Sequence, residues 1–119
     1  MRRGEVWLIN LDPTVGAEIR KTRPAVIVND DAIGILPLKV IVPITEWKAH
    51  YSIAPWMVHL EPSPENGLEK TSAADAFQVR SVAQERFVRR IGMLSEYDMR
   101  RIGSALSVVL CIDESCLPE

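Results

Sequence analysis

The sequence predicts a small, strongly curved β-barrel with one helix packed on it near the C-terminus. Six short segments rich in β-branched or aromatic residues recur along residues 5–91, with turn-forming residues between them. After Ser95 the hydrophobic period changes to that of a helix. The 119 residues are 47% hydrophobic and 25% charged, which is typical of a globular protein, so a single domain over residues 1–119 is expected.

The predicted strands follow one another at short intervals. Residues 5–11 form the first strand, and the turn residues of segment 12–16 end it. Residues 23–28 form the second, whose apolar centre is typical of a strand buried on both faces, and whose Pro24 stands at the strand start, where a missing N–H is tolerated. Four further strands are predicted at residues 39–45, 56–60, 76–82 and 87–91.

A helix of roughly four turns is predicted over residues 96–111. Ser95 precedes Asp98 by three residues, a spacing similar to that of a capping box. One apolar face should contain Ile102, Leu106, Val109 and Leu110.

Two predicted loops differ in character. Residues 61–70 are polar and rich in proline, whereas residues 30–38 are unusually apolar for a loop. An exposed apolar loop often marks a surface that contacts a partner. Ile33, Ile35 and Leu36 could equally fold back onto the core, and the sequence leaves both alternatives open.

Several classes of protein are excluded or disfavoured. No apolar run approaches the ~20 residues of a transmembrane helix. No long apolar segment follows Met1, so no signal peptide is visible and a cytoplasmic location is expected. The sequence also lacks a glycine-rich phosphate loop, a His/Cys cluster with metal-ligand spacing and a nucleophile elbow.

The isolated histidines and cysteines carry little functional signal. His50 and His59 have no evident orienting partner, which favours a structural or exposed position over catalysis. Cys111 and Cys116 match no common zinc spacing, and two cysteines do not make a disulfide framework, so idle thiols are expected.

The charge distribution is uneven. Fourteen Lys and Arg residues face sixteen Asp and Glu residues, and a net charge of −2 disfavours a nonspecific nucleic-acid binder. Arginines nevertheless gather in residues 80–101, where they form either a solvated surface or a set of phosphate contacts. These arginines are Arg80, Arg86, Arg89, Arg90, Arg100 and Arg101.

The loop before the second predicted strand has the composition of an anion-binding segment. Gly16 lies in the middle of the loop, where the backbone needs a positive φ or a close approach. Glu18 is followed by three bases, Arg20, Lys21 and Arg23. A basic loop beside an arginine fixed on a strand suits an anionic ligand, particularly a phosphodiester.

Arg23 is the arginine that a rigid element presents. The proline after it restricts its backbone to extended conformations, and it opens a buried strand. Arg23 either binds an anion or forms a surface ion pair with Glu18 or Asp30, and the residues alone do not decide between the two.

The three tryptophans could stack on bases, although Trp7, in the first strand, is expected in the core.

The ordered set of motifs resembles the MazF/PemK family of toxin ribonucleases. The resemblance is carried by residues 4–7, 11–14, 16–18, 21–26, 42–45, 78–81 and 90–95, and it covers nearly the whole chain. It implies an SH3-like barrel of the CcdB/PemK type, a homodimer, and cleavage of single-stranded RNA, mRNA in particular, at short motifs without a metal or cofactor. It also implies a cognate antitoxin whose C-terminal segment occupies the RNA site.

The resemblance also implies roles for single residues. Arg23 and Thr45 match the positions that the family uses for catalysis, and Glu18 matches a loop carboxylate implicated in some members. RNA contacts are expected at Gly16, Arg20, Lys21, Ser72, Gln78 and Arg80. Two departures concern the 71–77 segment: Thr71-Ser72 stands where the family often has Asp-Ser, and Phe77 stands where it often has an acidic residue.

The chemistry can be derived from the residues alone. Attack by a 2′-hydroxyl requires that the hydroxyl lose a proton, that the phosphorane charge be stabilised, and that the 5′-oxygen gain a proton. The Arg23 guanidinium suits the second task, and the Thr45 hydroxyl can hydrogen-bond to the phosphate or the 2′-hydroxyl. Glu18 is either the base or a residue that orients the loop by pairing with Arg20 or Arg23.

Two other functions stay open at this stage. Proteins of the CcdB type have the same barrel and bind DNA gyrase without cutting nucleic acid, so fold alone does not decide the function. An inactive module that only sequesters the antitoxin is a further alternative. In a homodimer, two basic loops near one groove could bind RNA despite the negative net charge.

Overall fold

The computed structural model describes residues 1–33 and 36–112. Its strands are β1 (Glu5–Asn10), β2 (Thr22–Ile27), β3 (Leu38–Glu46), β4 (Met57–Leu60), β5 (Ser72–Asp75), β6 (Arg80–Ala83) and β7 (Phe87–Met93). Three short 3-10 helices are η1 (Ala49–Ile53), η2 (Ala76–Gln78) and η3 (Gln84–Arg86), and one α-helix is α1 (Glu96–Leu110). The predicted mainly β fold with a C-terminal helix is confirmed.

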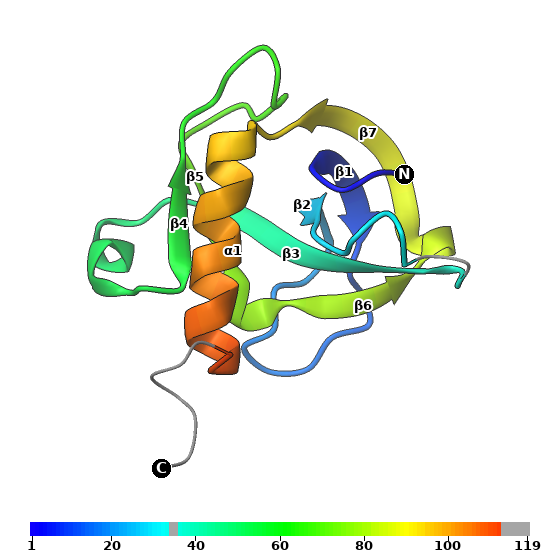
Figure 1. Cartoon of the computed structure of the whole chain (residues 1–119), viewed down its shortest axis with the longest axis horizontal. Helices are drawn as coiled ribbons and strands as arrows, with labels where there is room; N and C mark the ends of the chain where they lie inside the picture. Colours follow the sequence, from blue (N-terminus) through cyan, green and yellow to red (C-terminus); the bar gives the residue numbers. More distant parts are fainter. Residues whose placement is uncertain (34–35, 113–119) are drawn as a thin grey trace.

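All the strand pairs are antiparallel, and the sheet order is β4-β5-β3-β2-β1-β7. Strand β3 is the longest of these strands, so its first half pairs with β6 while its second half pairs with β5. The sheet curves strongly around itself, as Figure 1 shows. Its hydrogen bonding does not close into a barrel within the described residues, because β4 and β7 remain its two ends.

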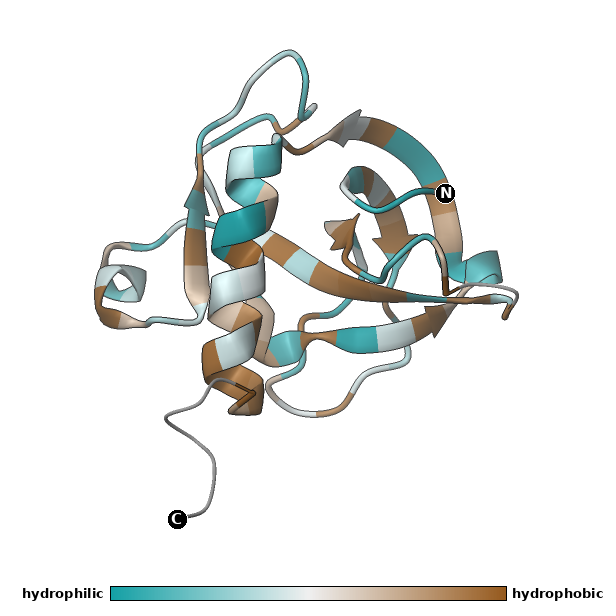
Figure 2. Ribbon diagram, viewed as in Figure 1, coloured by the Kyte–Doolittle hydropathy of each residue, from teal (hydrophilic) through white to brown (hydrophobic). Residues whose placement is uncertain are grey.

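Two apolar clusters lie on the two faces of the sheet. One fills the space between the sheet and α1, and it contains Val26, Val42 and Ile102. The other lies inside the curve of β1, β2, β3 and β6, and it contains Ile9, Leu11, Ala25, Ile27, Ile41 and Val82. Strand β2 is therefore buried on both faces, as its apolar centre predicts, and Figure 2 shows the hydrophobic residues concentrated on these strands.

The predicted strand over residues 76–82 is wrong in its first half. Strand β5 ends at Asp75, residues 76–78 form η2, and β6 begins at Arg80. The cause is Asp75, whose carboxylate accepts a hydrogen bond from the Phe77 N–H at 3.1 Å and turns the chain out of the strand.

Helix α1 begins and ends almost where the sequence predicts. The Ser95 hydroxyl accepts a hydrogen bond from the Asp98 N–H at 3.1 Å, which confirms the N-terminal cap. The buried face contains Met99, Ile102 and Ala105, with Leu106 and Val109 packed against it. The placement of Leu110 on this face is wrong, because its side chain is 53% exposed.

The remaining expectations are resolved in part. Ile33 and Leu36 are exposed and do not fold back onto the core, while Ile35 lies outside the described residues. Cys111 is disulfide-bonded, so the expectation of an idle thiol is wrong there; Cys116 lies outside the described residues. Among the residues described, no helix combines the length and the hydrophobicity that crossing a membrane requires.

Candidate active site

Arg23 and Thr45 come together through the pairing of β2 with β3. The paired residues run from Ile27 opposite Ile41 to Ala25 opposite Pro43, and Arg23 and Thr45 each lie two residues beyond the end of this pairing. Both residues line one hollow of about 370 Å³, which we call the arginine hollow. Its other polar lining residues are Glu46, Glu69, Lys70, Ser72 and Arg89.

The cations of the arginine hollow differ in their partners. Lys70 Nζ lies 3.5 Å from Glu46 Oε2, so its charge is partly balanced. Arg23 donates from Nε to the carbonyl oxygen of Arg20 at 3.3 Å, and it belongs to no ion pair among the described residues. Arg23 therefore does not form the surface ion pair with Glu18 or Asp30 that the sequence left open.

The loop between β1 and β2, residues 11–21, is held in place at both ends. The Leu11 N–H donates to the Lys21 carbonyl at 2.9 Å, and Asp12 Oδ1 accepts from the Lys21 N–H at 3.1 Å. Arg80 donates from Nη1 to the Leu11 carbonyl at 3.2 Å, while Arg86 donates to the carbonyl oxygens of Asn10 and Asp12. These contacts fix the base of a polar loop that lacks regular structure of its own.

Gly16 lies at the centre of this loop with a φ of +60°, as the sequence predicts. A side chain added at Gly16 would have open space around it, so the requirement concerns the backbone conformation rather than a close approach. Lys21 also has a positive φ, of 71°, at the point where the loop enters β2.

Gln78 reaches the loop from η2 and uses both ends of its amide there. Its Oε1 accepts from the Ile19 N–H at 2.6 Å, and its Nε2 donates to the Ala17 carbonyl at 3.3 Å. Gln78 therefore positions the loop as well as lining a second hollow of about 520 Å³, which we call the loop hollow. The lining of the loop hollow consists of Ala17, Glu18, Ile19, Pro43, Phe77, Gln78, Val79 and Arg80.

The structure thus divides the predicted site residues between two hollows. Arg23, Thr45 and Ser72 line the arginine hollow, whereas Glu18, Gln78 and Arg80 line the loop hollow. The two hollows share no lining residue, but both include part of β3, with Pro43 lining the loop hollow and residues 44–46 lining the arginine hollow. The other predicted contacts, Gly16, Arg20 and Lys21, lie on the loop and line neither hollow.

Two of the predicted site residues have their own intramolecular partners. Glu18 Oε1 accepts from the Val15 N–H at 2.6 Å, so the carboxylate holds the loop, although not through the predicted pair with Arg20 or Arg23. Ser72 is buried, and its hydroxyl donates to the Lys70 carbonyl at 2.7 Å. Both groups are already engaged within the protein.

Arg89 lines the arginine hollow and was missed as a single residue by sequence reasoning. It lies on β7, opposite Leu8 of β1, and its guanidinium has no ion pair or hydrogen bond among the described residues. The arginine-rich stretch was the available signal, but it did not distinguish one arginine from another. Of the six arginines, Arg80 and Arg86 hold the loop, while Arg90, Arg100 and Arg101 lie near Glu5, Glu96 and Asp98.

Two buried carboxyl groups have shifted pKa values. Burial raises the pKa of Asp75 above its usual range, although hydrogen bonds from Phe77 and Gln78 oppose the shift. Burial would also raise the pKa of Glu5, but the Trp7 indole N–H, a backbone hydrogen bond from Arg2 and the charges of the N-terminus and Arg90 outweigh it. Together they lower the pKa of Glu5.

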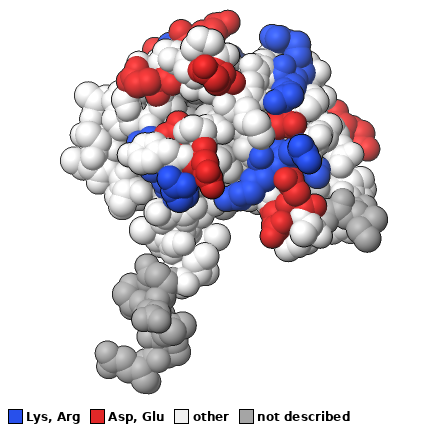
Figure 3. Space-filling model, turned by 45° about the horizontal axis from the view of Figure 1, so that its top comes forward, with Lys and Arg blue, Asp and Glu red and all other residues white. Residues whose placement is uncertain are grey.

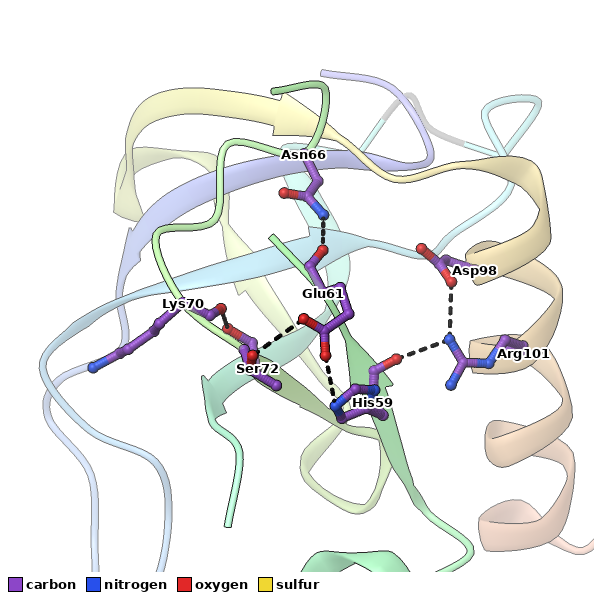
Figure 4. A network of polar contacts seen from close by, with 8 residues as sticks. His59, Glu61, Asn66, Lys70, Ser72, Asp98 and Arg101 are labelled. Atoms are coloured by element: carbon purple, nitrogen blue, oxygen red, sulfur yellow. Dashed lines mark hydrogen bonds and ion pairs between the residues drawn. The ribbon is translucent and has the colours of Figure 1, made fainter. Parts of the chain in front are cut away.

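A third hollow, of about 630 Å³, lies between β4, the 61–66 segment and the start of α1. We call it the histidine hollow. Its lining residues His59 and Glu61 form a pair with 3.0 Å between Nε2 and Oε1, so His59 does have the orienting partner that the sequence did not reveal. Arg101 of α1 donates to the His59 carbonyl at 2.8 Å and to Asp98 Oδ1 at 2.9 Å (Figure 4).

The surface charge is mixed rather than basic overall. On the face shown in Figure 3, the largest group of Lys and Arg side chains is bordered by Asp and Glu side chains. Among the described residues, no three His, Cys, Asp or Glu side chains gather as a group that could hold a metal ion. Trp7 is half-buried, packs edge-on against Phe87 and donates to Glu5, which agrees with the expected place in the core.

Comparisons with known proteins agree on one family. The family model described as "PemK-like, MazF-like toxin of type II toxin-antitoxin system" matches residues 2–110. Endoribonuclease MazF9 of Mycobacterium tuberculosis (strain ATCC 25618 / H37Rv) is 35% identical over 116 residues, covering 92% of this chain and 96% of that protein. Endoribonuclease PemK of Escherichia coli is 33% identical over 112 residues, covering 92% and 82%.

Solved structures show the same fold. MazF (Form-I) from Deinococcus radiodurans has a TM-score of 0.76 at 22% identity, covering 93% of this chain and 96% of that chain. A mycobacterial endoribonuclease in complex with its cognate antitoxin has a TM-score of 0.75 at 20% identity, covering 95% and 97%. At these identities the likeness concerns the fold.

Proposed function

The chain belongs to the PemK-like, MazF-like toxins of type II toxin–antitoxin systems, and we propose that it acts as an endoribonuclease that cleaves single-stranded RNA, mRNA in particular, within short sequence motifs. The observation that carries the proposal is the arginine hollow, where Arg23 and Thr45 meet and the Arg23 guanidinium is free of ion pairs among the described residues. The relatives are named endoribonucleases, which favours this function over the gyrase-binding alternative.

The proposed reaction uses the RNA's own 2′-hydroxyl as the nucleophile. Its oxygen attacks the adjacent phosphorus, the bond to the 5′-oxygen breaks, and the products are a 2′,3′-cyclic phosphate or 3′-phosphate and a 5′-hydroxyl. Arg23 donates two parallel hydrogen bonds to the nonbridging oxygens and stabilises the charge of the phosphorane. Thr45, which lines the same hollow as Arg23, hydrogen-bonds to the phosphate or the 2′-hydroxyl and orients it for attack.

The site has few groups suited to transferring protons. An arginine pKa above about 12 makes Arg23 a reluctant proton shuttle. Glu18, the other proposed catalytic group, lines the loop hollow rather than the arginine hollow, and its carboxylate already accepts from the Val15 N–H. A role in holding the loop fits this geometry better than a role as base. Positioning and charge stabilisation would then supply most of the rate, and turnover would be modest.

The loop and η2 are proposed to hold the RNA strand on either side of the scissile phosphate. Arg20 and Lys21 lie on the exposed loop, where their charges suit the phosphate backbone, and Gly16 is proposed to contact the strand from the centre of that loop, whose conformation its positive φ allows. Gln78 and Arg80 line the loop hollow while also fixing the loop, so each can order the strand indirectly. Ser72 lines the arginine hollow and is proposed to contact the RNA there.

Two protein partners are part of the proposal. A second copy of the chain, related by a two-fold axis, would bring two basic loops to one groove and raise the local potential for RNA despite a net charge of −2. A cognate antitoxin is expected because solved neighbours include a complex of this kind, and acidic and apolar groups on it would compete with RNA. The expected place of action is the cytoplasm, where mRNA is available.

The test is incubation with a long single-stranded RNA in EDTA. Wild-type protein should give discrete fragments with 5′-hydroxyl ends, because no step uses a metal. Arg23→Ala should lower the cleavage rate by about 10²- to 10³-fold, the usual cost of removing one donor to a developing oxyanion. Thr45→Val keeps the side-chain shape but removes the hydroxyl, and should lower the rate by a smaller factor.

The matched control is Arg100→Ala, an exposed helix arginine paired with Glu96, which should cleave like wild type. Intact RNA with every protein, across several unrelated RNA sequences, would contradict the proposed nuclease. A gyrase supercoiling assay would then test the alternative.

A further inference from the structure

Two aromatic side chains form an exposed pair beside the loop hollow. Trp56 precedes β4 and is 36% exposed, and Phe77 of η2 is 65% exposed. Their ring centroids lie 5.8 Å apart with an interplanar angle of 60°. Two large apolar rings that touch one another at the surface differ from the single scattered hydrophobic residues that surfaces normally carry.

The backbone beneath this pair is fixed. The buried carboxylate of Asp75 accepts from the Phe77 N–H at 3.1 Å, which sets the turn that points Phe77 away from the sheet. The Ala76 N–H donates to the Trp56 carbonyl at 3.0 Å, which ties the segment before β4 to the start of η2. The two rings are thus presented by backbone that is already ordered, so a ligand that uses them meets a small entropic cost.

The surroundings of the pair are polar, and the loop hollow beside it is lined by charges of both signs, Glu18 and Arg80. Phe77 lines the loop hollow together with Gln78 and Pro43, and Pro43 directly precedes on β3 the residues 44–46 that line the arginine hollow. A planar ligand with hydrogen-bonding edges matches an aromatic pair beside a polar hollow better than an aliphatic protein side chain does. A nucleobase has that chemistry.

We propose that Trp56 and Phe77 form a stacking subsite for one base of the RNA strand, next to the nucleotide that is cleaved. The inference rests on the proposed nuclease function and adds a contact to it. Stacking tolerates every base because every base has a π face, so the subsite adds affinity and positioning with little discrimination among bases.

The experiment compares Phe77→Ala with RNA that lacks single bases. The cleavage motif is first mapped with wild-type protein on a long RNA. Oligonucleotides across that motif are then made with a 2′-deoxy nucleotide at the scissile position, which blocks cleavage, and with an abasic nucleotide at each flanking position in turn. The dissociation constant of every pair of protein and oligonucleotide is measured.

We expect one flanking position at which the missing base weakens binding by wild type roughly ten-fold and has no effect on binding by Phe77→Ala. Phe77→Trp should restore the sensitivity to the abasic nucleotide, because an aromatic ring is present again. Tyr97→Ala is the matched control: Tyr97 is 64% exposed, as Phe77 is 65% exposed, but it lies on the first turn of α1 and lines neither site hollow. It should keep the wild-type profile.

Three results would overturn the stacking subsite. One is an abasic profile that Phe77→Ala leaves unchanged, and another is an equal loss at every position. A third is a variant that changes the oligomeric state or weakens antitoxin binding while its abasic profile stays wild-type, because the pair would then belong to a protein interface. If wild type cleaves RNA and one of these results appears, only the stacking proposal fails. If wild type neither cleaves nor binds RNA, the proposed function fails with it.

Discussion

The arginine hollow and the histidine hollow contain similar kinds of side chain but use them differently. In the histidine hollow, His59 pairs with Glu61, and Arg101 donates hydrogen bonds to Asp98 and to the His59 carbonyl. In the arginine hollow, Arg23 and Arg89 line the surface without an ion pair among the described residues. The histidine hollow is the larger of the two, at about 630 Å³ against about 370 Å³.

This difference suggests that the histidine hollow stabilises the fold, whereas the arginine hollow is suited to bind a ligand. Arg101 uses Nη1 to join α1 to β4 and to pair with Asp98, so the charge that an external anion would need is already balanced by a carboxylate. Arg23 spends one donor, Nε, on the carbonyl of Arg20, and both of its terminal nitrogens stay available for a bidentate phosphate contact. Volume alone would select the histidine hollow, whereas the absence of ion pairs at Arg23 and Arg89 among the described residues favours the arginine hollow.

The largest expected effect comes from exchanging arginine for lysine in both regions. Arg23→Lys keeps the charge but loses the planar pair of donors, so cleavage should fall by about 10²-fold. Arg101→Lys should cleave RNA at the wild-type rate per folded molecule and unfold at a lower urea concentration, because the link from α1 to β4 is weakened. Initial cleavage rates and urea unfolding measured on the same preparations check both. Equal losses of cleavage rate in the two variants would contradict the assignment of different roles to Arg23 and Arg101.

A smaller effect is expected from Arg89, through binding rather than chemistry. Arg89→Gln should weaken binding of a 2′-deoxy-blocked RNA several-fold and lower the slope of log affinity against log salt by about 0.7, the value for one phosphate contact on a single strand. Arg100→Gln removes a charge of the same type that is paired with Glu96 on the helix, and its slope should equal that of wild type. If the two variants have the same slope, Arg89 does not contact the RNA backbone.

The smallest effect concerns two buried carboxyl groups with opposite pKa shifts. The lowered pKa of Glu5 stabilises the fold above about pH 4.3, and this stabilisation is lost as the pH falls through the folded-state pKa. The raised pKa of Asp75 stabilises the fold below about pH 3.9 relative to higher pH, and this contribution is lost as the pH rises through its folded-state pKa.

Glu5→Gln should therefore cost more unfolding free energy at about pH 7 than at about pH 3.5, and Asp75→Asn should cost less at about pH 7 than at about pH 3.5. Urea unfolding at both pH values measures the two differences. If the pH dependence of the two substitutions has the same sign, the opposite pKa shifts of Glu5 and Asp75 are contradicted.

Much of the fold could be read from the sequence because its signals are local. The apolar centre of β2 predicted burial on both faces, and Ser95 with Asp98 predicted the start of α1. The strand predicted over residues 76–82 was wrong because one side-chain hydrogen bond from Asp75 replaced extended backbone by a turn. Alternation of residue types alone does not reveal such a bond.

For the candidate site, the sequence by itself identified the residue types and their order: Arg23 before a strand proline, Thr45 at the end of β3, and the basic loop with Gly16. Which of these residues meet was decided only by tertiary structure. The pairing of β2 with β3 brings Arg23 and Thr45 to one hollow, while Gln78 and Glu18, which hydrogen-bond to the loop, line a different hollow. Arg89 shares this hollow with Arg23 because β7 and β2 both pair with β1, where Leu8 has Arg89 opposite it on one side and Pro24 on the other; such pairing joins residues far apart in the sequence and cannot be read from any short stretch of it.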